Sequence, residues 1–380
     1  MPAAERSLPY QPAIDGLRAL SIVAVMLFHA AALARLPEWF TGGFLGVTVF
    51  FVVSGYLITT LLLKEAVATR SIKLGGFWSR RARRLAPASL TVVLAAILIT
   101  NRSWSAWPGF HAADALAGTW GVMNWQLIAL GEEQIIRGLG PLTPYWSLAI
   151  EEQFYVLLAL GLAAAARSRT PPRTVALGLG AAWVTSLLAA NLFDLSDLAL
   201  EYSLITRAGE LATGGLLAVV VYVRPTFWAD SAAITRWAGP TSLAALLVLF
   251  VTASLDPPWL LHGGFLVVAA ISAVLLTAVH SPGPLRTALG MPQLVWVGKL
   301  SYSLYLVHWP IGLLLNANTS LVRWGSVTAQ LVASFVVAIA LHYAVERPLR
   351  YRTTARPNSS LWIWAGTSAA VSVLALALLV

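Results

Sequence analysis

Two polar residues, Arg18 and His29, interrupt the first long apolar run of this 380-residue chain. They are eleven residues apart. At about 100° per residue both project from one face of a helix, roughly 16 Å apart along its axis. A charged side chain at the depth of a bilayer costs roughly 2.5–3.5 kcal/mol on insertion scales and usually has a task. The alternative is a hydrogen-bonded core histidine and an arginine whose head group reaches back to the membrane surface.

Two adjacent glutamates, Glu151 and Glu152, lie inside another apolar run. If that run enters a membrane from the outside, Glu151 lies about 8 Å deep and His29 about 10 Å deep. We therefore predict a pair in which the imidazole of His29 accepts a proton and the carboxylate of Glu151 fixes its tautomer. Glu152 points about 100° away, toward a neighbouring helix or the outer loop. The alternative is that one of the glutamates pairs structurally with Arg207 or Arg137.

A basic run, FWSRRARRLAP at residues 77–87, opens the third apolar stretch and contains Arg80, Arg81, Arg83 and Arg84. At a helix N-terminus these guanidiniums add to the partial positive charge of the backbone, and they suit a diphosphate or a ribose phosphate. The alternative assigns them to membrane orientation and to contact with anionic lipid.

Two further stretches favour a substrate channel. GGFLGVTVFFVVSGYLIT, residues 42–59, is rich in small residues that permit close helix packing around a cavity. In GKLSYSLYLVHWPIG, residues 298–312, Tyr305 and His308 are three apart and share a helix face. Pro310 frees the carbonyl of residue 306, so the alternative role of His308 is to cap broken backbone. The channel candidates are Asp15, Ser54, Tyr56, Tyr305 and His308.

The composition places these residues in a membrane. Hydrophobic residues make up 58% of the chain and charged residues 11%, where a soluble domain has about half and a quarter. The absence of cysteine excludes disulfides and thiolate chemistry, and we find no metal-binding or nucleotide-loop motif. The net charge of +9 indicates membrane orientation rather than nucleic-acid binding. We predict an all-α polytopic membrane protein.

Hydropathy predicts a ten-helix transmembrane bundle and an eleventh, C-terminal transmembrane helix, because each apolar run can cross about 30 Å of hydrocarbon. We expect the first run to be an uncleaved span. The predicted spans are residues 14–36, 43–64, 85–101, 146–166, 174–193, 203–223, 237–255, 262–280, 299–316, 322–343 and 361–380.

The basic residues orient these spans. If segment 102–145 stays outside as a loop with a buried or interfacial helix, 19 of the 25 Lys and Arg residues fall on the cytoplasmic side, as the positive-inside rule requires. The N-terminus is then cytoplasmic, and the last span ends near the outer surface at Val380. That span is either a plain anchor or the lead to an extracytoplasmic domain.

The chain resembles the membrane acyltransferase-3 family, which transfers acyl groups to hydroxyls of sugars and other envelope or natural-product acceptors. Arg18 and His29 match the family's Arg-x10-His pattern, and the basic run matches its Arg-x-x-Arg pattern in two registers, Arg80–Arg83 and Arg81–Arg84. Six stretches occur in the family's order over residues 14–350: IDGLRALSIVAVMLFHA, GGFLGVTVFFVVSGYLIT, FWSRRARRLAP, YWSLAIEEQFY, GKLSYSLYLVHWP and VERPLR.

The resemblance implies ten spans, an acyl-CoA donor on the cytoplasmic side and an acceptor often outside. In some members an eleventh span leads to an extracytoplasmic SGNH hydrolase-like domain. We therefore expect a transmembrane acyltransferase domain over residues 1–350, followed by a basic linker and the eleventh helix over residues 351–380.

Residues and resemblance together predict a multi-pass O-acyltransferase of the bacterial cytoplasmic membrane that needs no metal. Arg18 and the four arginines of the basic run bind acyl-CoA, with acetyl-CoA the expected donor. His29, with Glu151 and Glu152 beside it, deprotonates a hydroxyl of a carbohydrate or glycolipid acceptor. Direct transfer and a covalent acyl-enzyme both stay open. The alternatives are a transporter or flippase with Arg18, His29 and Glu151 as a proton relay, and a non-catalytic partner that presents an acyl donor.

Overall fold

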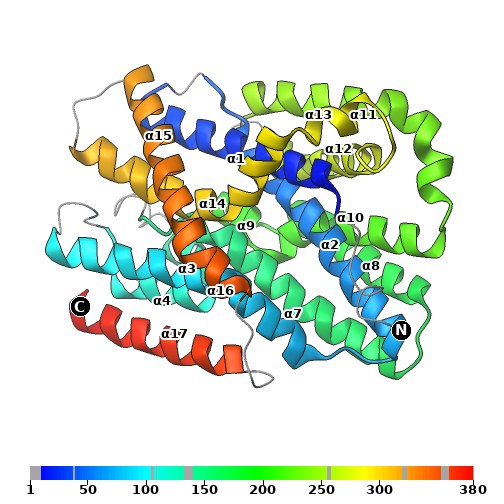
Figure 1. The fold of residues 1–380 in the computed structure, drawn as a ribbon, viewed down its shortest axis with the longest axis horizontal. Coiled ribbons are helices and arrows are strands. Elements are labelled where there is room, and N and C mark those ends of the chain that lie inside the picture. The colour runs from blue at the N-terminus through cyan, green and yellow to red at the C-terminus, as the bar shows by residue number, and fades with distance from the viewer. Residues whose placement is uncertain are drawn as a thin grey trace. The chain divides into compact units, whose positions relative to one another are not determined.

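The computed structural model describes residues 10–36, 39–103, 107, 109–131, 140–254, 258–318, 323–351 and 359–379. These residues form helices and connecting turns, with no strand among them (Figure 1). The predicted all-α class is confirmed.

The main helices are α1 (Pro12–Leu33), α2 (Gly46–Thr69), α3 (Leu74–Arg102), α4 (Ala112–Trp120), α5 (Met123–Leu130), α7 (Tyr145–Arg167), α8 (Pro172–Leu192), α9 (Asp197–Tyr202), α10 (Leu204–Val223), α11 (Phe227–Thr252), α12 (Phe265–Ala278), α13 (Pro284–Leu289), α14 (Pro292–Asn318), α15 (Trp324–Leu341), α16 (Arg347–Tyr351) and α17 (Ser359–Leu378). A 3₁₀ turn, η2 (Gly43–Leu45), precedes α2, and π-helical turns precede α12 and α16 as η4 (Leu260–Gly264) and η5 (His342–Glu346).

Prolines and serines set several helix starts. α8 begins at Pro172, and a proline in the first turn lacks only an N–H that would have had no helical partner. Ser196 and Ser203 cap α9 and α10, where their hydroxyls accept hydrogen bonds from the backbone N–H groups of Ala199 and Ile205.

As far as the structure describes them, the predicted spans fall on helices. Among the described residues, nine helices are long and apolar enough to cross a membrane, or ten if the bent pair Phe227–Ala233 and Thr235–Thr252 is one span. The helix at predicted span 299–316, α14, is not among them, because its serines, tyrosines, His308 and Lys299 lower its mean hydropathy. The structure therefore confirms a multi-pass membrane protein.

In the part of the segment between α3 and α7 that the structure describes, two short helices lie where one was predicted. α4 has nine residues and α5 has eight, and a span needs about 20. The break is at Gly121, whose φ of 67° lies in the left-handed region that glycine adopts without steric cost.

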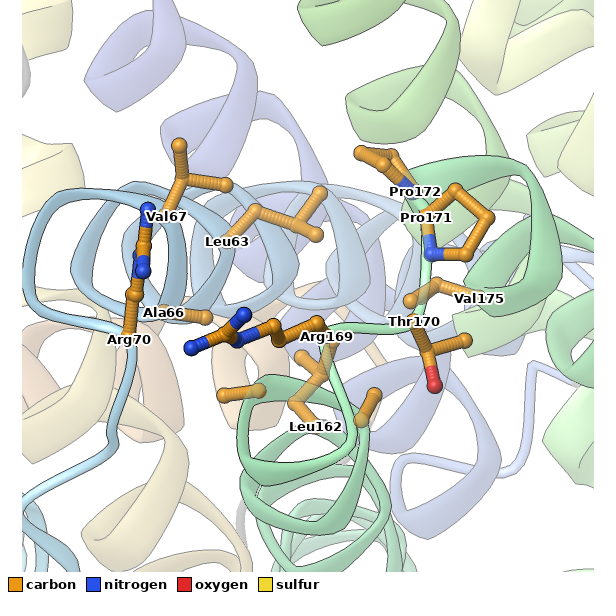
Figure 2. A pocket seen from close by; sticks show the side chains of 12 residues that line it. Leu63, Ala66, Val67, Arg70, Leu162, Arg169, Thr170, Pro171, Pro172 and Val175 are labelled. Carbon is orange, nitrogen blue, oxygen red and sulfur yellow. The ribbon is translucent and has the colours of Figure 1, made fainter.

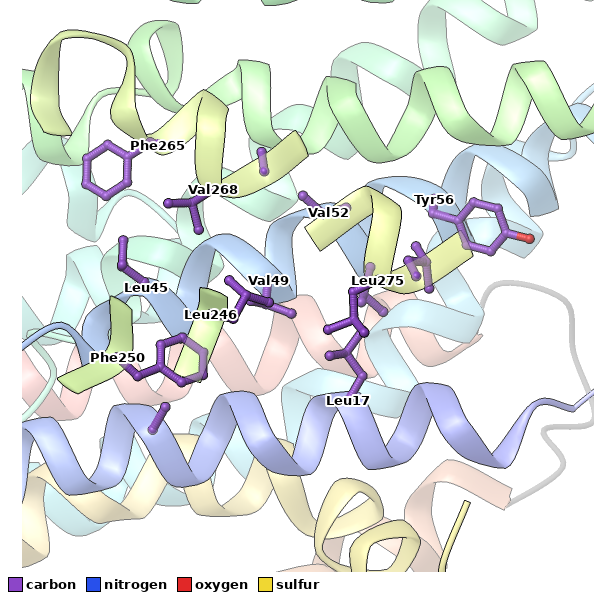
Figure 3. Close-up of a cluster of buried hydrophobic side chains, with 14 of the residues drawn as sticks. Leu17, Leu45, Val49, Val52, Tyr56, Leu246, Phe250, Phe265, Val268 and Leu275 are labelled. Carbon is purple, nitrogen blue, oxygen red and sulfur yellow. The ribbon is translucent and has the colours of Figure 1, made fainter. Parts of the chain in front are cut away.

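The chain divides into two compact units. Unit 1 comprises Met1–Phe28, Glu38–Ile72 and Glu151–Ser301, and unit 2 comprises His29–Pro37, Lys73–Ile150 and Tyr302–Val380. In unit 1, α10 packs against α2 and α8, and α11 packs against α12. Figure 3 shows the apolar core of unit 1, to which α2 contributes Val49 and Val52 and α11 contributes Leu246 and Phe250.

In unit 2, α17 lies along α3 and α4 (Figure 1). Small or short side chains of α17, such as Ser368 and Ala375, are buried, as is usual where membrane helices approach closely. The indole N–H of Trp120 in α4 donates to Ser372 at 3.0 Å, and its ring lies 6.0 Å from that of Trp364. α17 is therefore packed into unit 2, while the predicted boundary at residue 350 stays a prediction.

Candidate functional site

His29 and His308, which the sequence assigned to different roles, form a hydrogen-bonded pair in unit 2. Nδ1 of His29 lies 2.9 Å from Nε2 of His308. The two rings stack with their centroids 5.0 Å apart. α1 carries one ring and α14 the other, so the pair joins two helices that are far apart in the sequence.

The hydrogen bonds of His308 determine where the protons of this pair lie. Its Nδ1 is 2.8 Å from the carbonyl oxygen of Tyr305 and 3.1 Å from that of Leu304. A carbonyl only accepts, so Nδ1 of His308 carries a proton and its Nε2 carries a lone pair. Nδ1 of His29 must then donate to that lone pair. Neutral His29 therefore has its own lone pair on Nε2, the atom that a general base uses.

The alternative role of His308, as a cap for the carbonyl freed by Pro310, is only partly right. His308 does donate to backbone carbonyls, but these are the carbonyls of Leu304 and Tyr305 and not that of Leu306. Its other nitrogen contacts His29. His308 thus connects the backbone of α14 to the side chain predicted to do the chemistry.

Trp309 and Tyr305 fix the same part of α14. The Trp309 ring lies 4.9 Å from that of His29, and its indole N–H donates to the carbonyl of Gly140 at 3.0 Å. The Tyr305 hydroxyl lies 2.8 Å from the carbonyl of Pro144 and 2.6 Å from the hydroxyl of Ser147. Sequence reasoning missed Trp309 and Ser147, although both stand in stretches that carry the family resemblance.

Arg18 is held by Asp15, one helical turn before it. Nη1 of Arg18 lies 3.3 Å from Oδ1 of Asp15, and its Nη2 donates to the hydroxyl of Ser301 at 2.8 Å. The approach of α14 to α1 requires glycine at position 298, because a Cβ there would lie 1.9 Å from the carbonyl oxygen of Asp15. Asp15 thus positions Arg18, and its predicted place in the channel stays a prediction.

The basic run does not lie at a helix N-terminus, and that prediction is wrong. α3 begins at Leu74, so the arginines occupy its second and third turns, while the helix-dipole effect falls off within the first. Nη1 of Arg83 donates to the hydroxyl of Ser360 in α17 at 3.1 Å. The Tyr302 hydroxyl of α14 donates to the carbonyl of Leu85 at 2.9 Å. Both helices therefore hold this region of α3, and the two arginine registers stay open.

The remaining channel candidates, Ser54 and Tyr56, lie in unit 1. The Ser54 hydroxyl bonds that of Tyr155. The Tyr56 hydroxyl lies 3.3 Å from Nε2 of His280, whose Nδ1 donates to a backbone carbonyl one turn earlier. The ring of Trp228 stacks on His280 at 4.1 Å, and burial lowers the pKa of His280. No feature of the sequence selected His280, because it stands at the end of the predicted span 262–280, near a loop.

Glu151 and Glu152 lie about two turns into α7, both half-buried. They belong to unit 1 and His29 belongs to unit 2, so the predicted pairing of Glu151 with His29 stays a prediction. Arg207 bonds Glu210 of its own helix, and Arg137 lies outside the described residues.

Comparison with known proteins identifies relatives over nearly the whole chain. A family described as "Acyltransferase domain" matches residues 11–347. The peptidoglycan O-acetyltransferase OatA of Listeria monocytogenes is 32% identical over 366 residues, which cover 90% of this chain and 56% of the relative. The O-acetyltransferase OatA of Staphylococcus aureus is 34% identical over 322 residues, or 81% of this chain and 51% of the relative. The chain thus spans about half the length of these curated relatives. No solved structure matches.

Proposed function

This chain belongs to the acyltransferase-domain family that matches residues 11–347, and we propose that it transfers an acetyl group from cytoplasmic acetyl-CoA to a hydroxyl of an envelope carbohydrate. The names of its relatives support the acetyl group, and that of the Listeria relative supports peptidoglycan as the acceptor. The resemblance to the acyltransferase-3 family supports acyl-CoA as the donor. The excess of predicted cytoplasmic basic residues supports a cytoplasmic N-terminus.

The hydrogen bond between Nδ1 of His29 and Nε2 of His308, from which we infer the tautomer of His29, is the observation that carries this proposal. Because His29 donates through Nδ1 to His308, its Nε2 accepts the proton of the acceptor hydroxyl. The hydroxyl oxygen bonds to the thioester carbonyl carbon, and the carbon–sulfur bond breaks. The thiolate of CoA then takes the proton from Nε2, so that the products are the O-acetyl ester and free CoA. General-base catalysis of this type contributes typically about 10²–10⁴-fold.

Arg18 and the basic run of α3 would hold the phosphates of the donor. Arg18 is oriented by Asp15 and Ser301, and Arg83 by Ser360, so that both guanidiniums are positioned before a donor arrives. The distance of roughly 16 Å between Arg18 and His29 along α1 is one that an extended pantetheine arm largely covers.

The test follows free CoA released by the purified protein in lipid nanodiscs, with radiolabelled acetyl-CoA and a peptidoglycan oligosaccharide. We expect His29→Ala to lower release about 10²–10⁴-fold and to leave the unfolding temperature and acetyl-CoA binding unchanged. The control is His262→Gln, since the His262 ring bonds only the backbone carbonyl of Ala190 among its described contacts. Normal release by His29→Ala would refute the proposal. A wild type that neither binds nor consumes any acyl-CoA in a panel would refute it in favour of a transporter.

A further inference from the structure

A pocket of about 270 Å³ lies in unit 1, where α2 and α7 end and α8 begins (Figure 2). Its walls are mostly aliphatic and include Leu63 and Val67 of α2, Leu162 of α7 and Val175 of α8. None of the residues to which we assign a part in acetyl transfer lines it. The pocket is therefore suited to a ligand that has an apolar part and that is not the acyl donor.

Two arginines supply the only charges among the lining residues. Arg70 and Arg169 line the pocket, and no carboxylate does. Figure 2 shows the guanidinium of Arg169 directed across the opening toward the last turn of α2, where Arg70 lies. Neither arginine forms an ion pair with any residue that the structure describes. Guanidiniums bind phosphate through paired hydrogen bonds, so the pocket is suited to a phosphate attached to an apolar chain.

Both arginines occupy backbone positions that usually belong to glycine. Arg70 ends α2 with a φ of 51°, and Arg169 follows the end of α7 with a φ of 55°. Glycine is the usual residue there, because a side chain makes the left-handed conformation costly. Five non-glycine residues among the described ones have positive φ, and two of them line this one pocket. At positions 70 and 169 the chain thus carries arginine in a conformation that favours glycine. The guanidinium of each arginine is a group that glycine lacks.

The three helices around the pocket are all candidate membrane spans, so the pocket lies at their ends, near the membrane surface. The orientation predicted from the basic residues places these ends at the cytoplasmic leaflet, where anionic lipids attract basic groups. A free phosphate or a nucleotide would leave the aliphatic walls uncovered, whereas the acyl chains of a phospholipid would cover them.

We propose that this pocket binds one anionic phospholipid of the inner leaflet. Arg70 and Arg169 bind its phosphate, and its acyl chains pack against Leu63, Val67 and Leu162. The lipid fills the gap between the ends of α2 and α7 and the start of α8. This site is independent of the acetyl transfer proposed above, so either proposal can fail without the other.

The test measures lipid retention by native mass spectrometry after exchange from phosphatidylcholine nanodiscs into mixtures with phosphatidylglycerol. We expect one retained phosphatidylglycerol per wild-type chain, and about tenfold less in Arg70→Gln/Arg169→Gln, because charge-assisted hydrogen bonds are lost. The matched control is Arg167→Gln/Arg173→Gln, which removes the same number of positive charges from the end of α7 and the start of α8, at residues that do not line the pocket. An equal loss of retained phosphatidylglycerol in the control and pocket variants would refute the proposal. It would show that the lipid is held only by general attraction to positive charge.

A second variant separates binding from backbone strain. Arg70→Gly/Arg169→Gly relieves both left-handed positions, so it should unfold at or above the wild-type temperature in phosphatidylcholine and still lose the retained phosphatidylglycerol. Full retention by this variant would refute the proposal. Displacement of the lipid by millimolar inorganic phosphate or by CoA would also refute it, in favour of a soluble anion. Persistence of the lipid against both supports it.

Discussion

Two buried polar clusters differ in how their hydrogen bonds run. In unit 1, Nη2 of Arg207 donates to Oε2 of Glu210 at 3.2 Å, and its Nη1 donates to the carbonyl of Glu201 at 2.9 Å. Its guanidinium also lies 3.8 Å from the ring centre of Phe265. In unit 2, a one-way series of donors runs from His29 to His308 and on to the backbone of α14. The first cluster neutralises a charge within one helical turn, whereas the second connects two helices through neutral rings.

This difference separates a structural role from a chemical one. The ion pair is nearly closed to solvent, with Arg207 2% and Glu210 0% exposed, and it balances its own charge. The histidine pair fixes a tautomer and so determines which ring nitrogen holds a lone pair. A buried polar side chain that fixes the orientation and tautomer of a second side chain is a better candidate for a catalytic site than an ion pair that only neutralises itself.

The largest expected effect comes from breaking the ion pair. Glu210→Ala removes the carboxylate that neutralises Arg207, and removal of one partner of a buried pair costs about 3–5 kcal/mol. We expect a correspondingly lower unfolding temperature and unchanged turnover per folded molecule. The double variant Arg207→Met/Glu210→Leu should recover most of the stability, because apolar residues replace both charges. A Glu210→Ala protein that stayed stable but had little turnover would contradict this prediction. It would assign the chemical role to the ion pair.

His308 should have the opposite signature. His308→Ala removes the acceptor for Nδ1 of His29, so the wrong tautomer becomes populated. We expect kcat to fall about 10- to 100-fold, equivalent to about 1.4–2.7 kcal/mol, with KM for acetyl-CoA and the unfolding temperature little changed. His308→Gln should recover part of kcat, since its amide oxygen can accept the same hydrogen bond. If both variants lose the same kcat and unfold early, His308 only supports the fold.

The sequence predicted the positions of the spans better than the partners of the polar residues. Apolar runs mark helices, because lipid requires every backbone hydrogen bond to be made within the segment. Hydropathy did not show that α3 begins at Leu74, since arginines continue a helix as readily as leucines do. Nor did spacing along one chain show that His29 meets His308, because 279 residues separate them.

Trp309 offers a smaller test of how firmly the histidine pair is held. Trp309→Phe keeps an aromatic ring beside His29 but removes the N–H that donates to Gly140. One lost hydrogen bond costs about 1 kcal/mol, so we expect a turnover reduced a few-fold at most. Trp309→Leu removes the ring as well and should lower turnover further. Equal turnover in the two variants would show that the ring itself does not position His29.

His280, in unit 1, has hydrogen bonds arranged like those of His308 in unit 2. Its substitution should have the smallest effect. Its Nδ1 donates to the carbonyl of Leu276 at 2.8 Å, and its Nε2 accepts from Tyr56. Burial, and to a lesser extent the nearby positive charge of Arg286, lower the pKa of His280. The folded protein therefore favours the neutral ring, and this contribution to stability is present above the ordinary histidine pKa of about 6.5.

Acid should remove that contribution as the pH falls through the lowered pKa of His280. We expect the wild-type unfolding temperature to drop between about pH 7 and pH 5 more than that of His280→Gln, which cannot titrate there. Turnover per folded molecule should not distinguish the two proteins, because this histidine orients Tyr56 and not the proposed base. If the unfolding temperatures of the two proteins changed in parallel with pH, burial of His280 would not disfavour its charged form. A turnover difference that follows the same pH range would instead bring Tyr56 and His280 into the chemistry and remove the distinction between the two units.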